Sequence, residues 1–206
     1  MPTEDTEPLV AETPDGSGPP AAHKKKSTWR ELPVLVVAAV VLSLLIRMFL
    51  VQAFYIPSES MERTLHGCNG CSGNDRVLVW KLGTHFGTPK HGDIVVFDGR
   101  DSFASQTNEK DYIKRVIGLP GETIKCCDAQ GRVTRNGVAL DEPYLYEDDH
   151  QVFDSGVIPK GQLWLMGDHR GASSDSRACG CTVPIKRVVG RAFVIVWPPS
   201  RVGLLN

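Results

Sequence analysis

One apolar stretch of membrane length lies near the N-terminal end of the chain and constrains how the rest can be arranged. It runs from Leu32 or Pro33 to about Ala53, with three polar interruptions at Ser43, Arg47 and Gln52. At a rise of 1.5 Å per residue, about 20 helical residues cover the ~30 Å hydrocarbon core of a bilayer. One helix therefore spans it if the side chain of Arg47 extends to the interface. We expect a transmembrane helix over residues 31–53.

Basic residues flank this stretch mainly on its N-terminal side. Lys24, Lys25, Lys26 and Arg30 precede it, and the next basic residue after it is Arg63. Because cytoplasmic flanks carry the excess of Lys and Arg, we expect a single-pass protein of the cell membrane with a cytoplasmic N-terminus. The three lysines would also contact anionic membrane lipid.

A cleaved signal peptide is the alternative interpretation of the same stretch. Val51, Gln52 and Ala53 resemble a small-residue cleavage site that follows an apolar core. The roughly 30 residues before that core are long for a signal peptide, which favours the uncleaved anchor.

Composition divides the chain into three parts. Residues 1–30 are rich in Pro, Glu, Asp, Gly and Ala, so we expect a disordered cytoplasmic tail. Residues 54–206 suffice for one extracytoplasmic domain with a hydrophobic core. The formal net charge of −1, with both signs mixed along the chain, argues against a nucleic-acid partner.

The periodicity beyond the apolar stretch is that of β-strands. Short segments rich in Val, Ile, Leu and aromatics alternate with Gly, Pro, Asn or Asp. The expected strands are Arg76–Leu82, Asp93–Phe97, Asp111–Gly118, Glu122–Cys126, Gln162–Gly167 and Arg191–Trp197. These predict a mainly β, antiparallel domain, either a partly open barrel or packed sheets. The polar segments Asp98–Lys110 and Asp141–Gly156 are expected to be loops.

Ser60 and Lys114 are the candidate catalytic residues. A lysine activates a hydroxyl only when its amine is neutral, and at a reference pKa of ~10.4 about a thousandth is neutral near pH 7.5. Strand alternation places Lys114 on one face with Tyr112 and Val116, an apolar setting that favours the neutral amine. Arg115 then points to the other face, where it is solvated or paired.

Four segments resemble type I signal peptidase, the Ser-Lys leader peptidase family of bacterial membranes. Residues 56–65, IPSESMERTL, resemble the nucleophile block P-S-x-S-M-x-P-T-L. Residues 112–122, YIKRVIGLPGE, resemble the lysine block K-R-[VI]-[VIA]-G-x-P-G-[DE]. Residues 167–177, GDHRGASSDSR, are similar to G-D-N-R-x-x-S-x-D-S-R, and residues 91–97, HGDIVVF, to the strand R-G-D-[IV]-[VI]-x-F. The four follow one another in the family's order.

The resemblance implies a role for each matching residue. Ser60 becomes the nucleophile and Lys114 the general base, while Ser58 assists oxyanion stabilisation and Ser173 orients the lysine amine. Five charged residues are expected to support the geometry by pairing: Arg115, Asp168, Arg170, Asp175 and Arg177. The implied activity is a membrane-bound serine endopeptidase that removes signal peptides from exported preproteins after small residues, Ala-x-Ala, without metal or cofactor.

Two residues depart from the family pattern. Arg63 stands where the nucleophile block usually has Pro, and His169 replaces the usual Asn. His169 raises the alternative of a triad of Ser60, His169 and Asp168. Adjacent residues on extended backbone point to opposite faces and Lys114 already supplies a base, so we favour the dyad.

Six cysteines occur in three close pairs: Cys68/Cys71, Cys126/Cys127 and Cys179/Cys181. A zinc ribbon is one interpretation, but an even count outside the membrane favours disulfides. A bridge among Cys68, Cys71, Cys179 and Cys181 would clamp two loops beside the site. Cys126 and Cys127 are expected to point to opposite faces and to bond elsewhere or stay reduced.

Two other functions remain as alternatives. One is a self-cleaving Ser-Lys regulator, against which the membrane anchor and the lack of a recognisable helix-turn-helix argue. The other is a secreted, disulfide-stapled binding module whose leader is cleaved after Ala53.

Overall fold

The computed structural model describes residues 31–81, 87–100, 110–147 and 150–205, so the expected tail over residues 1–30 lies outside it. It opens with one helix, α1 (Leu32–Phe49), which carries Pro33 in its first turn, where proline costs no hydrogen bond. Within the described residues, no helix has the combined length and apolarity required to cross a membrane.

The helix ends before the expected boundary at Ala53. Residues 51–53 belong instead to strand β1 (Val51–Tyr55), which pairs antiparallel with β2 (Arg76–Trp80). Val51, Gln52 and Ala53 lie opposite Trp80, Val79 and Leu78. The apolar run is therefore divided between a helix and the first strand of a sheet.

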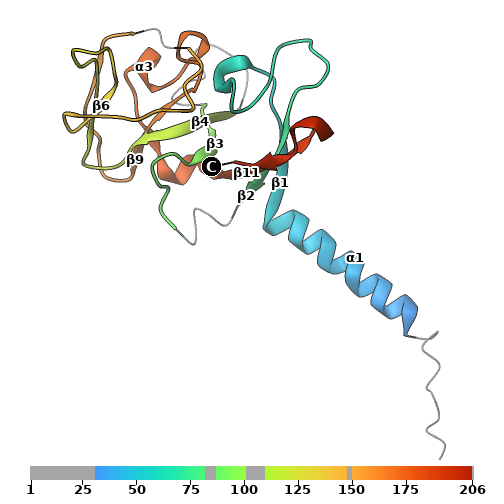
Figure 1. The fold of residues 1–206 in the computed structure, drawn as a ribbon. Helices are drawn as coiled ribbons and strands as arrows, with labels where there is room; N and C mark the ends of the chain where they lie inside the picture. Colours follow the sequence, from blue (N-terminus) through green and yellow to red (C-terminus); the bar gives the residue numbers. More distant parts are fainter. Residues whose placement is uncertain (1–30, 82–86, 101–109, 148–149, 206) are drawn as a thin grey trace, which may run out of the picture. The chain divides into compact units, whose positions relative to one another are not determined.

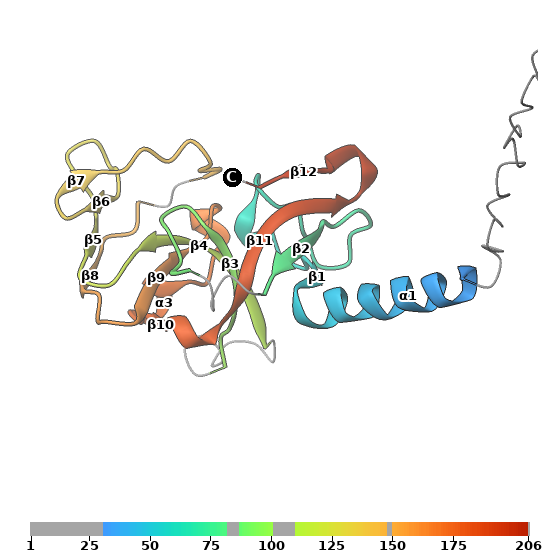
Figure 2. The same cartoon turned by 90° about the horizontal axis from the view of Figure 1, so that it is seen from below.

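The large sheet is antiparallel and has the order β1-β2-β11-β3-β4-β9-β10, with β12 paired to β11. Its other strands are β3 (Ile94–Asp98), β4 (Asp111–Gly118), β9 (Gln162–Met166), β10 (Val183–Pro184), β11 (Val188–Trp197) and β12 (Gly203–Leu204). A second antiparallel sheet has the order β7-β6-β5-β8. It contains β5 (Thr123–Cys126), β6 (Thr134–Arg135), β7 (Val138–Ala139) and β8 (Phe153–Val157). Figures 1 and 2 show the two sheets, with β3, β4 and β9 between β5–β8 and the β1–β2–β11 end.

Short helical turns connect the strands: η2 (Glu59–Met61), η3 (Arg170–Ala172), α3 (Ser176–Cys179), η4 (Ile185–Arg187) and η5 (Pro199–Arg201). The prediction of a mainly β, antiparallel domain is confirmed. The expected loop Asp141–Gly156 is wrong at its end, because Phe153–Gly156 belong to β8. That strand is mostly exposed, so it lacks the apolar alternation by which strands are predicted.

Three hydrophobic clusters form the core. The first cluster includes Ile56, Met61 and Leu65 around the nucleophile block, packed with Val77, Val79, Ile94, Val96, Ile113, Ala192 and Ile195. The second cluster contains Val95, Phe97, Val116, Leu163, Leu165, Val183 and Val188. The third joins β5 to β9 through Ile117, Ile124, Cys126, Val133, Ile158, Trp164 and Met166. β4 contributes to all three, because Ile113, Val116 and Ile117 belong to different clusters.

The cysteines form disulfides within each close pair: Cys68–Cys71, Cys126–Cys127 and Cys179–Cys181. The sequence left the connectivity among Cys68, Cys71, Cys179 and Cys181 open, and the structure forms the two local bridges and not one between the two loops. The expectation for Cys126 and Cys127 is wrong, because β5 ends at Cys126 and strand alternation does not extend to Cys127. All six sulfurs are bridged, which leaves no thiolate for a zinc ribbon.

Candidate active site

Ser60 and Lys114 meet inside the domain. The Nζ of Lys114 donates a hydrogen bond to Ser60 Oγ at 2.7 Å, although the residues are 54 positions apart. Both side chains are buried, with 4% exposure each. Lys114 lies in β4 opposite Val95, a residue of the second cluster. A buried, mainly apolar setting disfavours the ammonium form of a lysine, so this contact joins a hydroxyl to a potential base.

The nucleophile block holds Ser60 from both sides. Ser60 lies in the 3₁₀ turn η2, and its neighbour Met61 and the preceding Ile56 are buried in the first cluster. Ser58 has an extended backbone just before this turn, and its Oγ lies 3.3 Å from Ser60 Oγ. Two buried apolar side chains thus fix the turn, while the two hydroxyls stay next to each other.

Arg115, the residue after Lys114, is paired and buried at 2% exposure, so the solvated alternative is wrong. Its Nε and Nη2 donate to the two oxygens of Asp168 at 2.9 and 2.7 Å. Thr64 Oγ1 donates to the same carboxylate at 2.5 Å. Because Thr64 belongs to the nucleophile block, this two-pronged ion pair connects that block to the lysine strand.

The third block forms a second buried network behind the site. Asp175 caps α3 by accepting from the backbone N–H of Arg177, and its carboxylate also pairs with the Arg177 guanidinium at 2.9 Å. Its Oδ2 accepts from the backbone N–H of Gly167 at 3.0 Å. Arg170 donates from Nε to the Gly167 carbonyl oxygen at 3.0 Å. The first network therefore ends at the Asp168 carboxylate and the second at the backbone of its neighbour Gly167.

Ser173 lies beside the nucleophile. A Cβ added to Gly167 would overlap both Ser173 Oγ and the carbonyl oxygen of Ser60, which places the three residues in direct contact. In the part of the chain that the structure describes, Ser173 Oγ is buried without a hydrogen-bond partner. The structure thus brings Ser173 to the site but records no bond to the Lys114 amine.

The segment that contains Glu142 and Tyr144, which the sequence patterns did not single out, packs against this site. Glu142 forms an ion pair with Arg170 at 2.5 Å, both side chains being at most 8% exposed. Tyr144 places its ring 3.9 Å from the Arg115 guanidinium carbon and donates its hydroxyl to Glu142. Burial raises the pKa of Tyr144 well above its usual value, and the Glu142 carboxylate adds to the shift, so the phenol stays a donor. Two tyrosines at alternate positions in an otherwise polar segment were the available signal.

The structure does not support a triad through His169. The ring Nδ1 lies 3.3 Å from the carbonyl oxygen of Glu59, and Nε2 lies 3.0 Å from Glu147 Oε2. Asp168 is engaged by Arg115 and Thr64. Both ring nitrogens thus have partners other than the Ser60 hydroxyl.

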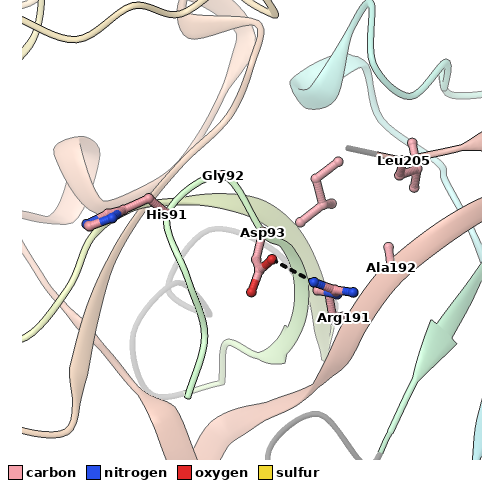
Figure 3. A pocket seen from close by; sticks show the side chains of 7 residues that line it. His91, Gly92, Asp93, Arg191, Ala192 and Leu205 are labelled. Carbon is pink, nitrogen blue, oxygen red and sulfur yellow. Dashed lines mark hydrogen bonds and ion pairs between the residues drawn. The ribbon is translucent and has the colours of Figure 1, made fainter. Parts of the chain in front are cut away.

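A cavity of about 240 Å³ lies between the start of β3 and β11, lined by His91, Gly92, Asp93, Ile94, Arg191, Ala192 and Leu205. In Figure 3, Asp93 and Arg191 point toward each other, and their charged atoms are 3.1 Å apart. Gly92 connects the cavity to the active site, because the Gly92 carbonyl oxygen accepts a hydrogen bond from Arg115 Nη1 at 2.9 Å. No residue proposed for catalysis lines this cavity.

Comparisons with known proteins identify the family to which the chain is similar. The model of the family described as signal peptidase, peptidase S26, matches residues 29–197. A signal peptidase I of Mycobacterium tuberculosis (strain ATCC 25618 / H37Rv) is 39% identical over 228 residues, which covers 88% of this chain and 77% of that protein. Signal peptidase I T of Bacillus subtilis (strain 168) is 34% identical, covering 86% of this chain and 90% of that protein. A crystal structure of a signal peptidase I from Enterococcus faecalis V583 aligns with a TM-score of 0.41 and 30% identity, covering 50% of this chain and 96% of that one.

The chain belongs to the signal peptidase family, peptidase S26. The resemblance in the four sequence blocks is thereby confirmed, and so is the expectation of an enzyme that hydrolyses peptides. The binding-module alternative finds no support in these relatives.

The Arg115–Asp168 pair generates a stability prediction. Asp168→Asn leaves the buried Arg115 guanidinium without its carboxylate, so the free energy of unfolding should fall by about 3–5 kcal/mol. Denaturant unfolding of the detergent-solubilised full chain measures the change. Asp154→Asn is the matched control, because its pair with Lys125 is about half exposed and screened by water, so its loss should leave stability almost unchanged. Equal losses in the two variants would contradict the prediction.

Gly167 generates a prediction about geometry. In Gly167→Ala the new Cβ meets the Ser60 carbonyl oxygen and Ser173, so the nucleophile turn must shift. We expect a loss of about 1–3 kcal/mol in stability and up to ~100-fold in turnover. Gly171→Ala is the control, since nothing lies within 4 Å of its added Cβ. Peptide cleavage and thermal melting of both variants provide the test, and a fully active Gly167→Ala enzyme would refute it.

Proposed function

We propose that Ser60 is the nucleophile and Lys114 the general base with which this signal peptidase removes signal peptides from exported preproteins. Family membership establishes the removal of signal peptides by a serine peptidase. The observation that supports the two roles is the 2.7 Å hydrogen bond between buried Lys114 Nζ and Ser60 Oγ. A general base must lie within hydrogen-bond reach of the proton that it removes.

The reaction proceeds through an acyl-enzyme. The neutral Lys114 amine takes the hydroxyl proton while Ser60 Oγ bonds to the carbonyl carbon, and the carbonyl electrons move to oxygen. When the tetrahedral intermediate collapses, the peptide C–N bond breaks and Lys114 returns the proton to the departing amine. Water then attacks the ester carbon and loses a proton to Lys114. As this second tetrahedral intermediate collapses, the bond to Ser60 Oγ breaks, Lys114 returns the proton to that oxygen, and the signal peptide leaves with a new carboxylate.

Two hydroxyls assist these steps. The backbone N–H of Ser60 and the hydroxyl of Ser58 donate to the developing oxyanion; removing one such donor typically costs about 3 kcal/mol. The 3.3 Å distance between the Ser58 and Ser60 hydroxyl oxygens supports that role. Ser173 orients the Lys114 amine, which its position against Gly167 and the Ser60 carbonyl supports. Arg115, Asp168, Arg170, Asp175 and Arg177 hold these groups in place.

The substrate binds as an extended strand and is cleaved after small residues, Ala-x-Ala. β1 is an edge strand of the large sheet and leads along the chain into Ser58 and Ser60, so its free edge can pair with a peptide. Ile56 and Met61 are at most 1% exposed and pack in the first cluster, so they support the nucleophile turn from below the apolar wall of the substrate site. Tyr55, which is 53% exposed, lies at the surface end of this wall.

The apolar N-terminal segment anchors the enzyme in the cell membrane, with the N-terminus cytoplasmic and the catalytic domain outside. Residues on every side of α1 are apolar and exposed, as for a helix whose solvent is lipid. The exposed set includes Leu32, Val34, Leu35, Val36, Val37, Val40, Val41, Leu42 and Leu44. Cleavage after Ala53 would remove three paired residues of β1, which supports retention of the segment.

The dyad predicts the effects of two substitutions. Ser60→Ala removes the nucleophile, and Lys114→Met keeps the aliphatic stem but removes the base. Each should lower the cleavage rate of an Ala-x-Ala preprotein by at least ~1,000-fold, with the melting temperature preserved. Ser200→Ala and Lys125→Ala are surface controls that should cleave at the wild-type rate. Near-normal turnover by either dyad variant would eliminate the mechanism.

The anchor predicts the fate of the N-terminal segment. We expect the full chain to remain in the membrane fraction after an alkaline wash, and its intact mass to include the residues before Ala53. Mass spectrometry of the extracted protein makes the measurement. A mature chain that lacks everything through Ala53 would instead indicate a cleaved leader and a soluble enzyme.

A further inference from the structure

The side chain of His169 lies against the backbone of the nucleophile turn. We propose that His169, oriented by Glu147 and Tyr146, is a positioning residue that sets the angle of this turn and so of Ser60. The proposal rests on the role of Ser60 proposed above, and it concerns residues outside the Ser-Lys dyad.

His169 contacts two successive carbonyl groups of the turn. Its backbone N–H donates to the carbonyl oxygen of Ser60 at 3.2 Å. Its ring Nδ1 lies 3.3 Å from the carbonyl oxygen of Glu59, and its Nε2 faces the Glu147 carboxylate. Both oxygens only accept, so the ring donates both hydrogen bonds when both of its nitrogens carry a hydrogen. The ring is 8% exposed, which shields both bonds from competing water. Since the peptides on each side of Ser60 are held, the direction of its N–H and its Oγ is restricted.

Glu147 and Tyr146 hold the imidazole in this orientation. Glu147 Oε2 lies 3.0 Å from His169 Nε2, and the Glu147 carbonyl oxygen accepts from the backbone N–H of Arg170 at 3.0 Å. The Tyr146 ring meets the imidazole edge to face, with centroids 4.9 Å apart. The backbone N–H of Tyr146 donates to the Asp168 carbonyl oxygen at 3.1 Å. A carboxylate behind one ring nitrogen fixes which way the other points.

The two departures from the family pattern meet at the same aromatic ring. The Arg63 guanidinium carbon lies 4.8 Å from the centroid of Tyr146, whose ring also contacts His169. Arg63 therefore connects the end of the nucleophile block to Tyr146, the ring that packs against His169. A cation over an aromatic face is attracted to the negative charge of the ring, so this contact favours one orientation of the turn.

Asp168 and His169 contact different parts of the nucleophile block. Asp168 accepts from Thr64 after the turn, and His169 donates to Glu59 and Ser60 within it. One dipeptide therefore reaches two parts of the block. The Asp168 contact leads to Arg115 and the lysine strand, whereas the His169 contact leads to the segment that contains Tyr146 and Glu147.

Steady-state cleavage by the full-length enzyme tests this inference through His169→Asn and Glu147→Gln. Both variants should lose about tenfold in kcat, because a misaligned nucleophile slows chemistry and not binding, and KM should stay within twofold of wild type. Glu147 is 65% exposed, so its variant should fold with an unchanged melting temperature. The double variant should be no slower than His169→Asn, since Glu147 acts through His169.

His91→Asn is the matched control. It removes a similar imidazole–carboxylate contact, His91 Nε2 to Glu122 at 2.9 Å, away from the nucleophile block, and should retain wild-type kcat. The inference is overturned if Ser60→Ala is inactive while Glu147→Gln and His169→Asn retain wild-type kcat, or if their effects appear only in KM. Activity in Ser60→Ala would instead refute the proposed function itself.

Discussion

The hydrogen bond between the Lys114 amine and Ser60 Oγ is the contact that the surrounding structure supports. Burying an ionisable amine costs free energy in its charged form, and the proposed chemistry needs the uncharged form. The burial of Lys114 in the centre of β4 therefore agrees with the role proposed for it as the base. Burying Lys114 beside the hydrophobic clusters costs stability, as is common where a residue is placed for function and not for packing.

Several buried ion pairs lie near this contact. They restrict how the segments around it can be arranged more than they add to stability. Replacing buried pairs by apolar residues is often neutral, whereas breaking one is costly, so such pairs mainly restrict which arrangement is allowed. Arg115–Asp168, Arg170–Glu142 and Arg177–Asp175 all lie within the same part of the fold. Their partners come from three different segments of the chain, so correct pairing requires those segments to be docked together.

The sequence predicted the strands whose apolar residues alternate. Its matching blocks also singled out Ser60 and Lys114, which the structure brings within hydrogen-bond distance of each other. It did not predict where α1 gives way to β1, because Val51 and Ala53 suit a lipid-facing helix and a strand equally well. Pairing with β2, a contact between segments distant in sequence, decides that boundary. The same reason explains why Glu142, Tyr144 and Glu147 were missed: each acts through a partner 22–29 residues away. Local patterns do not specify such partners.

The proposed anchor has a geometric consequence for catalysis. Phe49, the last residue of α1, is 11 positions before Ser60. Even a fully extended chain of that length spans at most about 40 Å, so an anchored helix keeps the nucleophile near the bilayer. A signal peptide held in the same membrane then presents its cleavage segment at a high effective concentration. A high effective concentration lowers the intrinsic affinity that the proposed pairing along the β1 edge must supply, which fits the cleavage after small residues proposed above.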